Sequence, residues 1–526
     1  MDVKFVNANE VPKIIKSDST LAIGGFIGIG ISEEIHSAME DGYLKKGEPN
    51  NLTLLYVGGM GDKMERGLNH YAHRGLVKRA VGGHWGLAPK FQPLVEAGEI
   101  EGYNFPQGVV SQMFKDAAAR RPFHVTTVGM GTFADPEIEG GKLNEQTTED
   151  LVTRVQIEGV QLLAYKTIFP DYAIIKGSYA DEKGNISFEE EPLTLEALSM
   201  ALATHNNGGK VIVQVRGVKP FGTLKPKDVE IPAVCVDYVV VAKDEDKHRQ
   251  TLATPFNDDF LTPGIVAAPN DEIHNLASEP LNIRKIIARR AAMCIVPGED
   301  YVLNYGIGMP EGVPTVLAEE DIAEAFLPTL EPGVFGGTPQ GGLDFGAAIH
   351  PESIIQQCDM FSFYNGGGID AAVLGMAEMD SHGNVNVSKF GSKLAGAGGF
   401  IDISQAAKKV IFVGSFMTHG CCYDFTGEKL HILKDDGNPK LVKNVEQITF
   451  SAKGALAHNQ KIYYVTERAV FTLTEKGVEL LEVAPGIDLE KDVLNRMEFE
   501  PIIADSFDIM ASSIFFNGSE NGNRKG

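Results

Sequence analysis

The sequence has little cysteine and no long apolar run. Its five cysteines are odd in number and form no C-x-x-C motif, so a disulfide framework is not expected. No stretch of about 18 apolar residues occurs, and the first residues lack the apolar segment of a secretion signal. These absences predict a cytoplasmic protein with reduced thiols.

Basic residues are scarce relative to acidic ones. Lys and Arg number 47 against 71 Asp and Glu, which gives a formal net charge of −24 spread along the chain. Such a surface repels nucleic acid and anionic membranes, so neither is an expected partner. An anionic small-molecule substrate must therefore be attracted by local hydrogen-bond donors.

Several common catalytic motifs are also missing. The sequence has no G-x-x-x-x-G-K-[ST] phosphate loop, no G-x-S-x-G nucleophile elbow and no H-E-x-x-H zinc helix. His70 and His73 lack acidic or thiol residues beside them in the sequence, so no metal site is predicted. Gly28-Ile29-Gly30 and Gly306-Ile307-Gly308 each supply two of the three dinucleotide glycines, but a glutamate fills the last position in both, so a nicotinamide site is a weak hypothesis.

What the sequence does contain is a repeated strand, glycine loop and helix. The first copy has a predicted strand at residues 20–23, then Gly28-Ile29-Gly30 and a helix that Ser32 is expected to cap. The second copy has a predicted strand at residues 301–303, and its Gly306-Ile307-Gly308 loop lies 278 residues after the first loop.

Two further matches share an offset of 199 residues. The turn sequence D-x-x-G-N occurs at 181–185 and at 380–384, and a similar apolar segment occurs at 210–213 and at 409–412. We therefore predict an α/β protein with two related open α/β domains from an internal duplication, each with a mostly parallel sheet flanked by helices.

The repeats also predict domain boundaries. Residues 1–255 are expected to form an N-terminal domain and residues 281–515 a C-terminal domain that carries the nucleophile, with a linker at 256–280 and a flexible tail at 516–526. The first half has 79 extra residues between its glycine loop and its D-x-x-G-N turn. In the second half, strands are expected at 461–466 and 469–473, and residues 363–368 are expected to end a strand.

One acidic residue stands out by its neighbours. Glu331 lies in Leu330-Glu331-Pro332-Gly333, between an apolar run and a glycine-rich segment. A carboxylate with few charged neighbours can lose water and become nucleophilic. Taken alone, however, the motif fits an ordinary glutamate on a glycine-rich loop better.

The wider sequence resembles the family I CoA-transferases in which two subunit types are fused, most closely the propionate and acetate CoA-transferase branch. The similarity covers nearly the whole chain. The matching segments are Gly24-Gly25-Phe26, Gly83-His84-Trp85, Tyr103-Asn104-Phe105-Pro106-Gln107-Gly108, Gly140-Gly141-Lys142-Leu143-Asn144, Val236-Asp237-Tyr238-Val239-Val240-Val241, Tyr364-Asn365-Gly366-Gly367-Gly368, Gly396-Ala397-Gly398-Gly399-Phe400 and Thr466-Glu467-Arg468.

The resemblance implies a CoA-transferase with ping-pong kinetics and no need for ATP. Glu331 occupies the Glu of the family's E-x-G motif and is expected to form a glutamyl-CoA thioester. Oxyanion donors are expected from Gly398 or Gly399, with help from Gln107. The residues expected to contact CoA are Gly306, Gly308, Gly366 and Gly367.

The resemblance further implies short-chain carboxylic acids as substrates, with acetate or propionate as examples. Coenzyme A is then a substrate, no cofactor is permanently bound, and a homo-oligomer (a dimer or tetramer) is expected.

Pro332 departs from the family, which usually has a small polar residue at this position. Two alternatives on the same fold therefore stay open: a thioesterase, or a catalytically impaired acyl-CoA-binding protein. Ser519-Glu520-Asn521-Gly522 spells a form of the catalytic motif of ketoacid-specific relatives, but it lies in a polar tail, and we interpret it as a coincidence.

Overall fold

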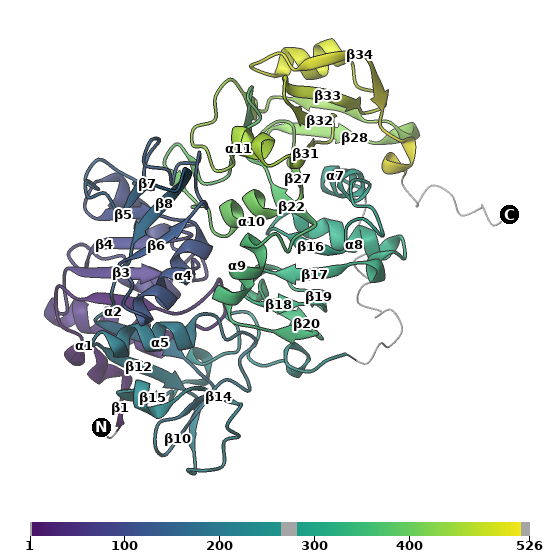
Figure 1. Ribbon diagram of the computed structural model, residues 1–526. Helices are drawn as coiled ribbons and strands as arrows, with labels where there is room; N and C mark the ends of the chain where they lie inside the picture. The colour runs from purple at the N-terminus through teal and green to yellow at the C-terminus, as the bar shows by residue number, and fades with distance from the viewer. Residues whose placement is uncertain (1–2, 265–280, 517–526) are drawn as a thin grey trace. The chain divides into compact units, whose positions relative to one another are not determined.

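The computed structural model describes residues 3–264 and 281–516, which form two compact units (Figure 1). Unit 1 comprises residues 1–264, 329–366 and 388–402, and unit 2 comprises residues 265–328, 367–387 and 403–526. Most of the expected linker (265–280) and of the expected tail (517–526, with Ser519-Glu520-Asn521-Gly522) lies outside the described residues. Among the residues described, no helix combines the length and the apolar character needed to cross a membrane.

Unit 1 is built on an eight-stranded sheet in which every neighbouring pair is parallel. The central strands are buried along their whole length, as is usual for parallel strands covered by helices on both faces. In spatial order the strands are β1 (Lys4–Val6), β15 (Tyr238–Val241), β12 (Lys210–Val215), β9 (Tyr172–Lys176), β2 (Thr20–Ile23), β3 (Leu52–Tyr56), β4 (Val77–Gly82) and β5 (Glu101–Asn104).

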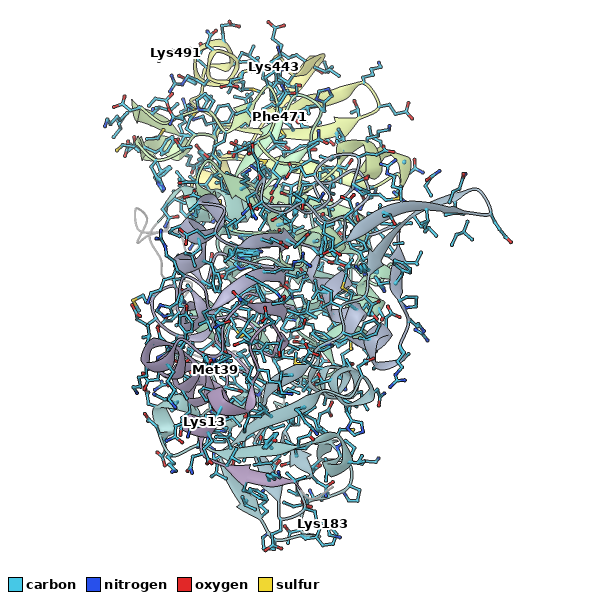
Figure 2. All side chains as sticks on the ribbon, turned by 90° about the vertical axis from the view of Figure 1, so that its left-hand side faces the viewer. Lys13, Met39, Lys183, Lys443, Phe471 and Lys491 are labelled. Atoms are coloured by element: carbon cyan, nitrogen blue, oxygen red, sulfur yellow. The ribbon has the colours of Figure 1, made fainter. Side chains whose placement is uncertain are left out.

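Alternate residues of these strands enter two different cores, because side chains of a strand point alternately to its two faces. Ala22 and Leu55 join the core formed with α4 and α5, whereas Leu21 and Leu54 join the core formed with α1, α2 and α3. Met39, labelled in Figure 2, is fully buried in the second core. The helices of unit 1 are α1 (Val11–Ile14), α2 (Glu33–Lys46), α3 (Gln92–Glu96), α4 (Gln107–Ala118), α5 (Ala197–Asn206) and α9 (Gln357–Asn365), and α10 (Phe400–Ala406) begins there.

Short strands complete unit 1. A four-stranded sheet contains β13 (Gly217–Lys219), β10 (Tyr179–Asp181), β11 (Ile186–Ser187) and β14 (Val229–Ile231), and a three-stranded one contains β6 (Phe123–Thr126), β8 (Val160–Lys166) and β7 (Val152–Ile157). The remaining short strands are β18 (Val334–Phe335), β21 (Ser353–Ile354), β19 (Thr338–Pro339), β20 (Ala348–Ile349), β25 (Lys389–Phe390) and β26 (Lys393–Leu394), and β17 (Leu327–Leu330) ends in unit 1.

Unit 2 also has a parallel sheet, with an antiparallel extension. β16 (Val302–Tyr305), β22 (Ala371–Gly375), β27 (Lys409–Val413) and β31 (Lys461–Val465) are parallel, β32 (Ala469–Thr474) and β33 (Gly477–Val483) follow antiparallel, and β34 (Ile502–Ile509) is parallel to β33. Phe471 on β32, labelled in Figure 2, is fully buried. The other elements are β23 (Glu378–Asp380), β24 (Val385–Asn386), β30 (Leu441–Val442), β28 (Cys421–Asp424), β29 (His431–Asp435), α7 (Ile283–Ala292), α8 (Gly312–Glu319) and α11 (Ala452–Ala457).

The duplication is visible in the strand registers. β9 and β12 recur 199 residues later as β22 and β27, with the same parallel register. The N–H of Gly24 donates to Ile174 O, and the N–H of Gly306 donates to Val373 O, again 199 residues after Ile174. In the structural repeat, Gly306 therefore corresponds to Gly24. The sequence match between the two G-I-G loops aligned Gly306 with Gly28 instead, which is four residues later than the structural equivalent.

The two D-x-x-G-N turns have equivalent hydrogen bonds. Asp181 accepts hydrogen bonds from the N–H groups of Lys183 and Asn185, at 2.9 and 3.0 Å. Asp380 accepts the equivalent pair of bonds in unit 2, again at 2.9 and 3.0 Å. The predicted α/β fold and its internal duplication are confirmed.

One local prediction was wrong, and another was confirmed in position only. Residues 363–365 are the last residues of helix α9, whereas the sequence predicted the end of a strand here. The buried Phe361 and Tyr364 are three residues apart on one helix face, and a short apolar run does not distinguish a helix from a strand. Ser32 is the N-cap residue of α2, as predicted, but its hydroxyl makes no capping bond. Gln214 Oε1 accepts from the N–H groups at the start of α2 instead, at 3.1 and 3.2 Å.

The compact units also differ from the predicted division at 255 and 281. Segments 329–366 and 388–402 lie in the second half of the sequence, yet they belong to unit 1. They contain the Glu331 loop and the second glycine cluster. The sequence repeat does not reveal that these two segments join unit 1, because their membership depends on packing between segments that are far apart in the chain.

Candidate active site

Glu331 lies in a three-residue turn between two paired strands. β17 and β18 are antiparallel, with Leu330 opposite Val334, and the N–H of Gly333 donates to Leu330 O at 3.0 Å. Gly333 has φ +126°, and a Cβ at this position would lie 2.0 Å from Ile355 O. Only glycine fits this turn, because an added side chain would collide with the neighbouring backbone. The turn therefore holds Glu331 in a fixed place.

Pro332 is packed into the same turn. It is buried, and a Cβ added to Gly346 would lie 3.1 Å from Pro332 Cγ and 2.8 Å from the Phe26 ring. Phe26 stacks on Phe345, with ring centroids 6.2 Å apart. Because Gly333 donates the hydrogen bond that closes the turn, the missing N–H of proline removes no bond from it.

The carboxyl group of Glu331 is electrostatically unusual. The residue is half-buried, and it has no ion-pair partner within the described part of the chain. Its pKa is raised to about 7, mainly by burial and also by the nearby Asp402 carboxylate, while the Gln107 side-chain amide opposes the rise. At neutral pH the group therefore changes readily between its neutral and ionised forms.

Gln107 is the first residue of α4 and is almost fully buried. Its main-chain N–H donates to Gly398 O at 3.0 Å, which ties the start of α4 to the second glycine cluster. Its side-chain Nε2 has no partner in hydrogen-bond geometry among the described residues, although the amide is close enough to lower the pKa of Glu331. Buried amides are seldom left in this state, so Nε2 is available to a bound group.

The glycine cluster at residues 396–399 is attached to the main sheet by hydrogen bonds. Asn104 Oδ1 accepts from Ala397 N at 2.9 Å, and Gly398 N donates to Gly83 O at 2.7 Å. The N–H of Gly398 is therefore already engaged. The N–H of the buried Gly399 has no partner among the described residues, so of the two predicted donors Gly399 is the one free to bind an oxyanion.

Two further side chains of this site carried no predicted role. Asp402 is fully buried on α10 and accepts from Gly108 N at 3.0 Å and from Asn365 Nδ2 at 3.2 Å. His84 lies beside the cluster, 3.7 Å from where a Gly398 Cβ would stand, and burial lowers its pKa to about 4, so it is neutral. A carboxylate three residues after a Gly-Gly pair was the sequence signal that could have identified Asp402.

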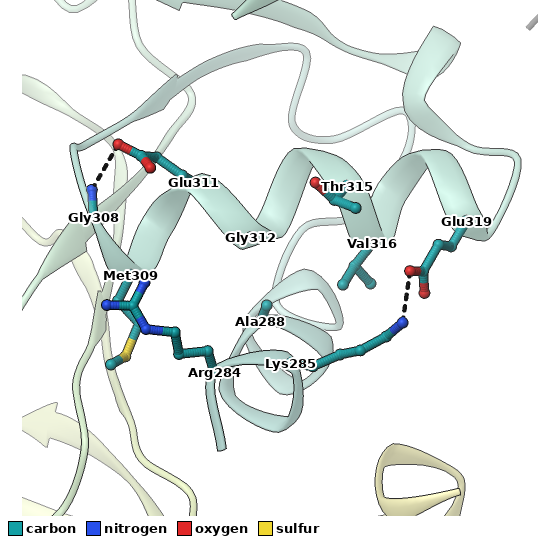
Figure 3. Close-up of a pocket in the computed structure, with 10 residues that line it drawn as sticks. All are labelled: Arg284, Lys285, Ala288, Gly308, Met309, Glu311, Gly312, Thr315, Val316 and Glu319. Carbon is teal, nitrogen blue, oxygen red and sulfur yellow. Dashed lines mark hydrogen bonds and ion pairs between the residues drawn. The ribbon is translucent and has the colours of Figure 1, made fainter. Parts of the chain in front are cut away.

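Gly306 and Gly308, which were predicted to contact CoA, lie in unit 2, whereas Glu331 lies in unit 1. Their N–H groups are engaged, with Val373 O at 2.9 Å and with Glu311 Oε1 at 2.9 Å. Gly308 nevertheless borders a cavity of about 230 Å³ between α7 and α8 (Figure 3). The other residues that line this cavity are Arg284, Lys285, Ala288, Met309, Glu311, Gly312, Thr315, Val316 and Glu319.

Gly366 and Gly367, also predicted to contact CoA, follow the end of α9. The N–H of Gly366 donates to Ser362 O at 3.1 Å as the helix closes, and Gly367 has φ +88°, which favours glycine. Both positions are explained by the helix end itself. Glu331, Gln107, Gly398, Gly399 and Gly366 thus belong to unit 1, whereas Gly306, Gly308 and Gly367 belong to unit 2.

Comparison with known proteins gives an independent result. The sequence model of the family described as Coenzyme A transferase matches residues 7–242. The chain is 40% identical to acetate CoA-transferase YdiF of Escherichia coli K12, covering 98% of this chain and 96% of YdiF. It is 43% identical to caffeate CoA-transferase of Acetobacterium woodii, covering 97% of each.

Solved structures agree with these relatives. The crystal structure of Escherichia coli O157:H7 acyl-CoA transferase YdiF as a thioester complex with CoA superposes with a TM-score of 0.91, at 38% identity, and covers 98% of this chain and 96% of that one. A full-length match at this identity shows common family membership. The chain is a fused family I CoA-transferase and belongs to the coenzyme A transferase family.

Proposed function

We propose that this CoA-transferase exchanges CoA between short-chain acyl-CoA esters and free carboxylic acids, such as acetate or propionate, through a glutamyl-CoA thioester at Glu331. The observation that carries the proposal is the environment of Glu331, whose pKa burial raises to about 7. A carboxylate that has lost water and has no cation beside it is a stronger nucleophile than an exposed one.

The reaction begins with ionised Glu331. Its oxygen attacks the thioester carbonyl of the donor, the carbon–sulfur bond breaks, CoA leaves as a thiolate, and a mixed anhydride forms. The thiolate then attacks the glutamyl carbonyl of this anhydride, the donor acid leaves as a carboxylate, and Glu331 carries CoA as a thioester. An acceptor carboxylate attacks that thioester, and the same two steps in reverse order yield the new acyl-CoA and free Glu331.

Each attack produces a tetrahedral oxyanion that needs fixed donors. The free N–H of Gly399 and Nε2 of Gln107 are suited to this task, because both are buried and neither has a good partner in the described residues. A donor of this kind typically contributes about 2.7–4 kcal/mol to the stability of the transition state. The neutral His84 adds no competing charge at the cluster.

The remaining parts of the proposal concern binding. We assign Gly306, Gly308, Gly366 and Gly367 to close approach of the CoA chain, where an absent side chain matters more than a free N–H. CoA is treated as a substrate, with no permanently bound cofactor. A homo-oligomer and a cytoplasmic setting rest on the sequence, and the five cysteines, all free, are compatible with reducing conditions.

The experiment is an exchange assay with a resolved readout. Acetyl-CoA and propionate are mixed with enzyme, and propionyl-CoA, acetate and free thiol are measured with and without acceptor acid. We expect propionyl-CoA without ATP, ping-pong kinetics and little free thiol. Thiol release that does not depend on an acceptor would identify a thioesterase instead, and tight acyl-CoA binding without turnover would identify a binding protein.

A further inference from the structure

Asp402 is a buried carboxylate without a cation. Its side chain is fully buried, and no Lys or Arg in the described residues forms an ion pair with it. A buried charge without an ion pair is costly, so it is retained in proteins chiefly where hydrogen bonds hold it and where it serves a purpose. Its two hydrogen-bond partners, Gly108 and Asn365, are both neutral.

These hydrogen bonds join three parts of the active site. Asp402 Oδ2 accepts from Gly108 N, the residue after Gln107, and Oδ1 accepts from Asn365 at the end of α9. Asp402 itself lies three residues after Gly399. The fit is close, because a Cβ on Gly108 would stand 2.2 Å from Asp402 Oδ1. One carboxylate thus fixes the Gln107 end of α4 relative to the Gly399 turn.

The charge of Asp402 also acts on Glu331. Asp402 raises the pKa of Glu331. The pKa of Asp402 is itself raised to about 6, with burial as the main cause and the bonds from Gly108 and Asn365 opposing the rise. Two other titratable groups interact electrostatically with Asp402: His124 favours its ionised form, and Tyr165 has its pKa raised by Asp402. His124 is itself bonded to Asp116 at 2.8 Å.

We propose that Asp402 is a positioning residue for CoA transfer. It fixes the Gln107 and Gly399 donors relative to each other, and it places a negative charge near Glu331. This inference rests on the proposed function. Free Glu331 carries a negative charge that Asp402 repels, whereas the glutamyl-CoA thioester is neutral. The repulsion therefore destabilises the free carboxylate relative to the thioester and favours the covalent intermediate.

The test compares Asp402→Asn with wild type. Asn keeps the shape and can still accept from Gly108, but it has no charge. We expect the acid limb of the pH profile of kcat/KM to move to lower pH, and the fraction of enzyme that carries CoA at Glu331, measured by intact mass after mixing with acetyl-CoA, to fall by about tenfold. About tenfold corresponds to one pKa unit of lost repulsion.

Asp135→Asn is the matched control. Asp135 is another fully buried carboxylate of unit 1, bonded to Arg154 at 2.8 Å and to the N–H groups of Gly131 and Glu137. This change can reduce stability but should leave the acid limb and the adduct fraction at Glu331 unchanged. An Asp402→Asn enzyme with a wild-type acid limb and a wild-type adduct fraction would overturn the inference.

A second variant covers the case in which Asp402→Asn does not fold. Asn365→Ala removes one bond that favours ionised Asp402, so it should shift the acid limb in the same direction by a smaller amount. An unchanged limb in this variant would also count against the inference. If no adduct forms at residue 331 even in wild type, the proposed function fails, and that result is distinct from failure of the role of Asp402.

Discussion

Two acidic side chains of unit 1, Glu191 and Glu331, have opposite electrostatic environments. Glu191 pairs with Lys176 at 2.5 Å, and both side chains are almost fully buried. Glu331 has Asp402 as its charged neighbour and, within the described residues, no cation. A paired buried charge keeps its ionised form and contributes to a fixed structure, whereas an unpaired one is held at higher free energy and can react.

The strongest way to test this contrast is to remove the reactive carboxylate. Glu331→Gln keeps the size of the side chain but cannot form an anhydride or thioester, so CoA exchange should fall by at least about 1,000-fold. The propionyl-CoA assay measures this loss, and circular dichroism checks the fold. Exchange at a near wild-type rate in a folded variant would exclude Glu331 as the nucleophile.

The paired site should respond in the opposite way. Glu191→Gln leaves Lys176 buried without its counter-charge, which should lower the free energy of unfolding by about 3–5 kcal/mol. Urea unfolding at pH 7 measures this change. At urea concentrations below the unfolding transition, kcat of the folded variant should stay near the wild-type value. A large loss of kcat with unchanged stability would contradict the structural role of this pair.

The unpartnered amide beside Glu331 should matter for the transition state. Gln107→Met keeps the length of the side chain but removes Nε2, so kcat should fall by about 100-fold with little change in KM. Gln112→Met is a matched control, since Gln112 lies on the same helix and binds Cys358 O and Ser362 at the surface. Equal losses in the two variants would argue for a general effect on α4.

The smallest expected effect is a change in the free energy of unfolding. Here the substitution should make the protein more stable. The pKa of Glu331 is raised above its ordinary value to about 7, so the neutral form is favoured in the folded state. This contribution is present at low pH and is lost as pH rises through 7. Glu331→Gln should therefore be more stable than wild type by about 1–3 kcal/mol at pH 8 and equal to it near pH 4. Unfolding curves at the two pH values measure the difference, and a variant less stable at pH 8 would contradict it.

Much of the fold could be predicted from periodicity and repeats. The strand at residues 20–23, the strands β31 and β32 and the two D-x-x-G-N turns depend on local sequence, and the structure confirms them. The exchange of segments 329–366 and 388–402 into unit 1 could not be predicted. Such an exchange is decided by which distant surfaces pack together, and no local pattern encodes it.

The candidate site was predictable only in part for the same reason. The family resemblance, and not the motif alone, indicated Glu331 as the nucleophile and Gly398 or Gly399 as an oxyanion donor. Which N–H is free depends on the bond from Gly398 to Gly83, more than 300 residues away. Asp402 acts through a neighbour from α4 and another from α9, so its part in the site becomes visible only once those helices are placed.

The most direct test of the central claim is intact-mass measurement after brief mixing with acetyl-CoA, followed by peptide mapping. We expect a CoA adduct on the peptide that contains residue 331, removed by hydroxylamine and absent in Glu331→Gln. A wild-type enzyme that exchanges CoA without any adduct, or with an adduct on another residue, would contradict the account.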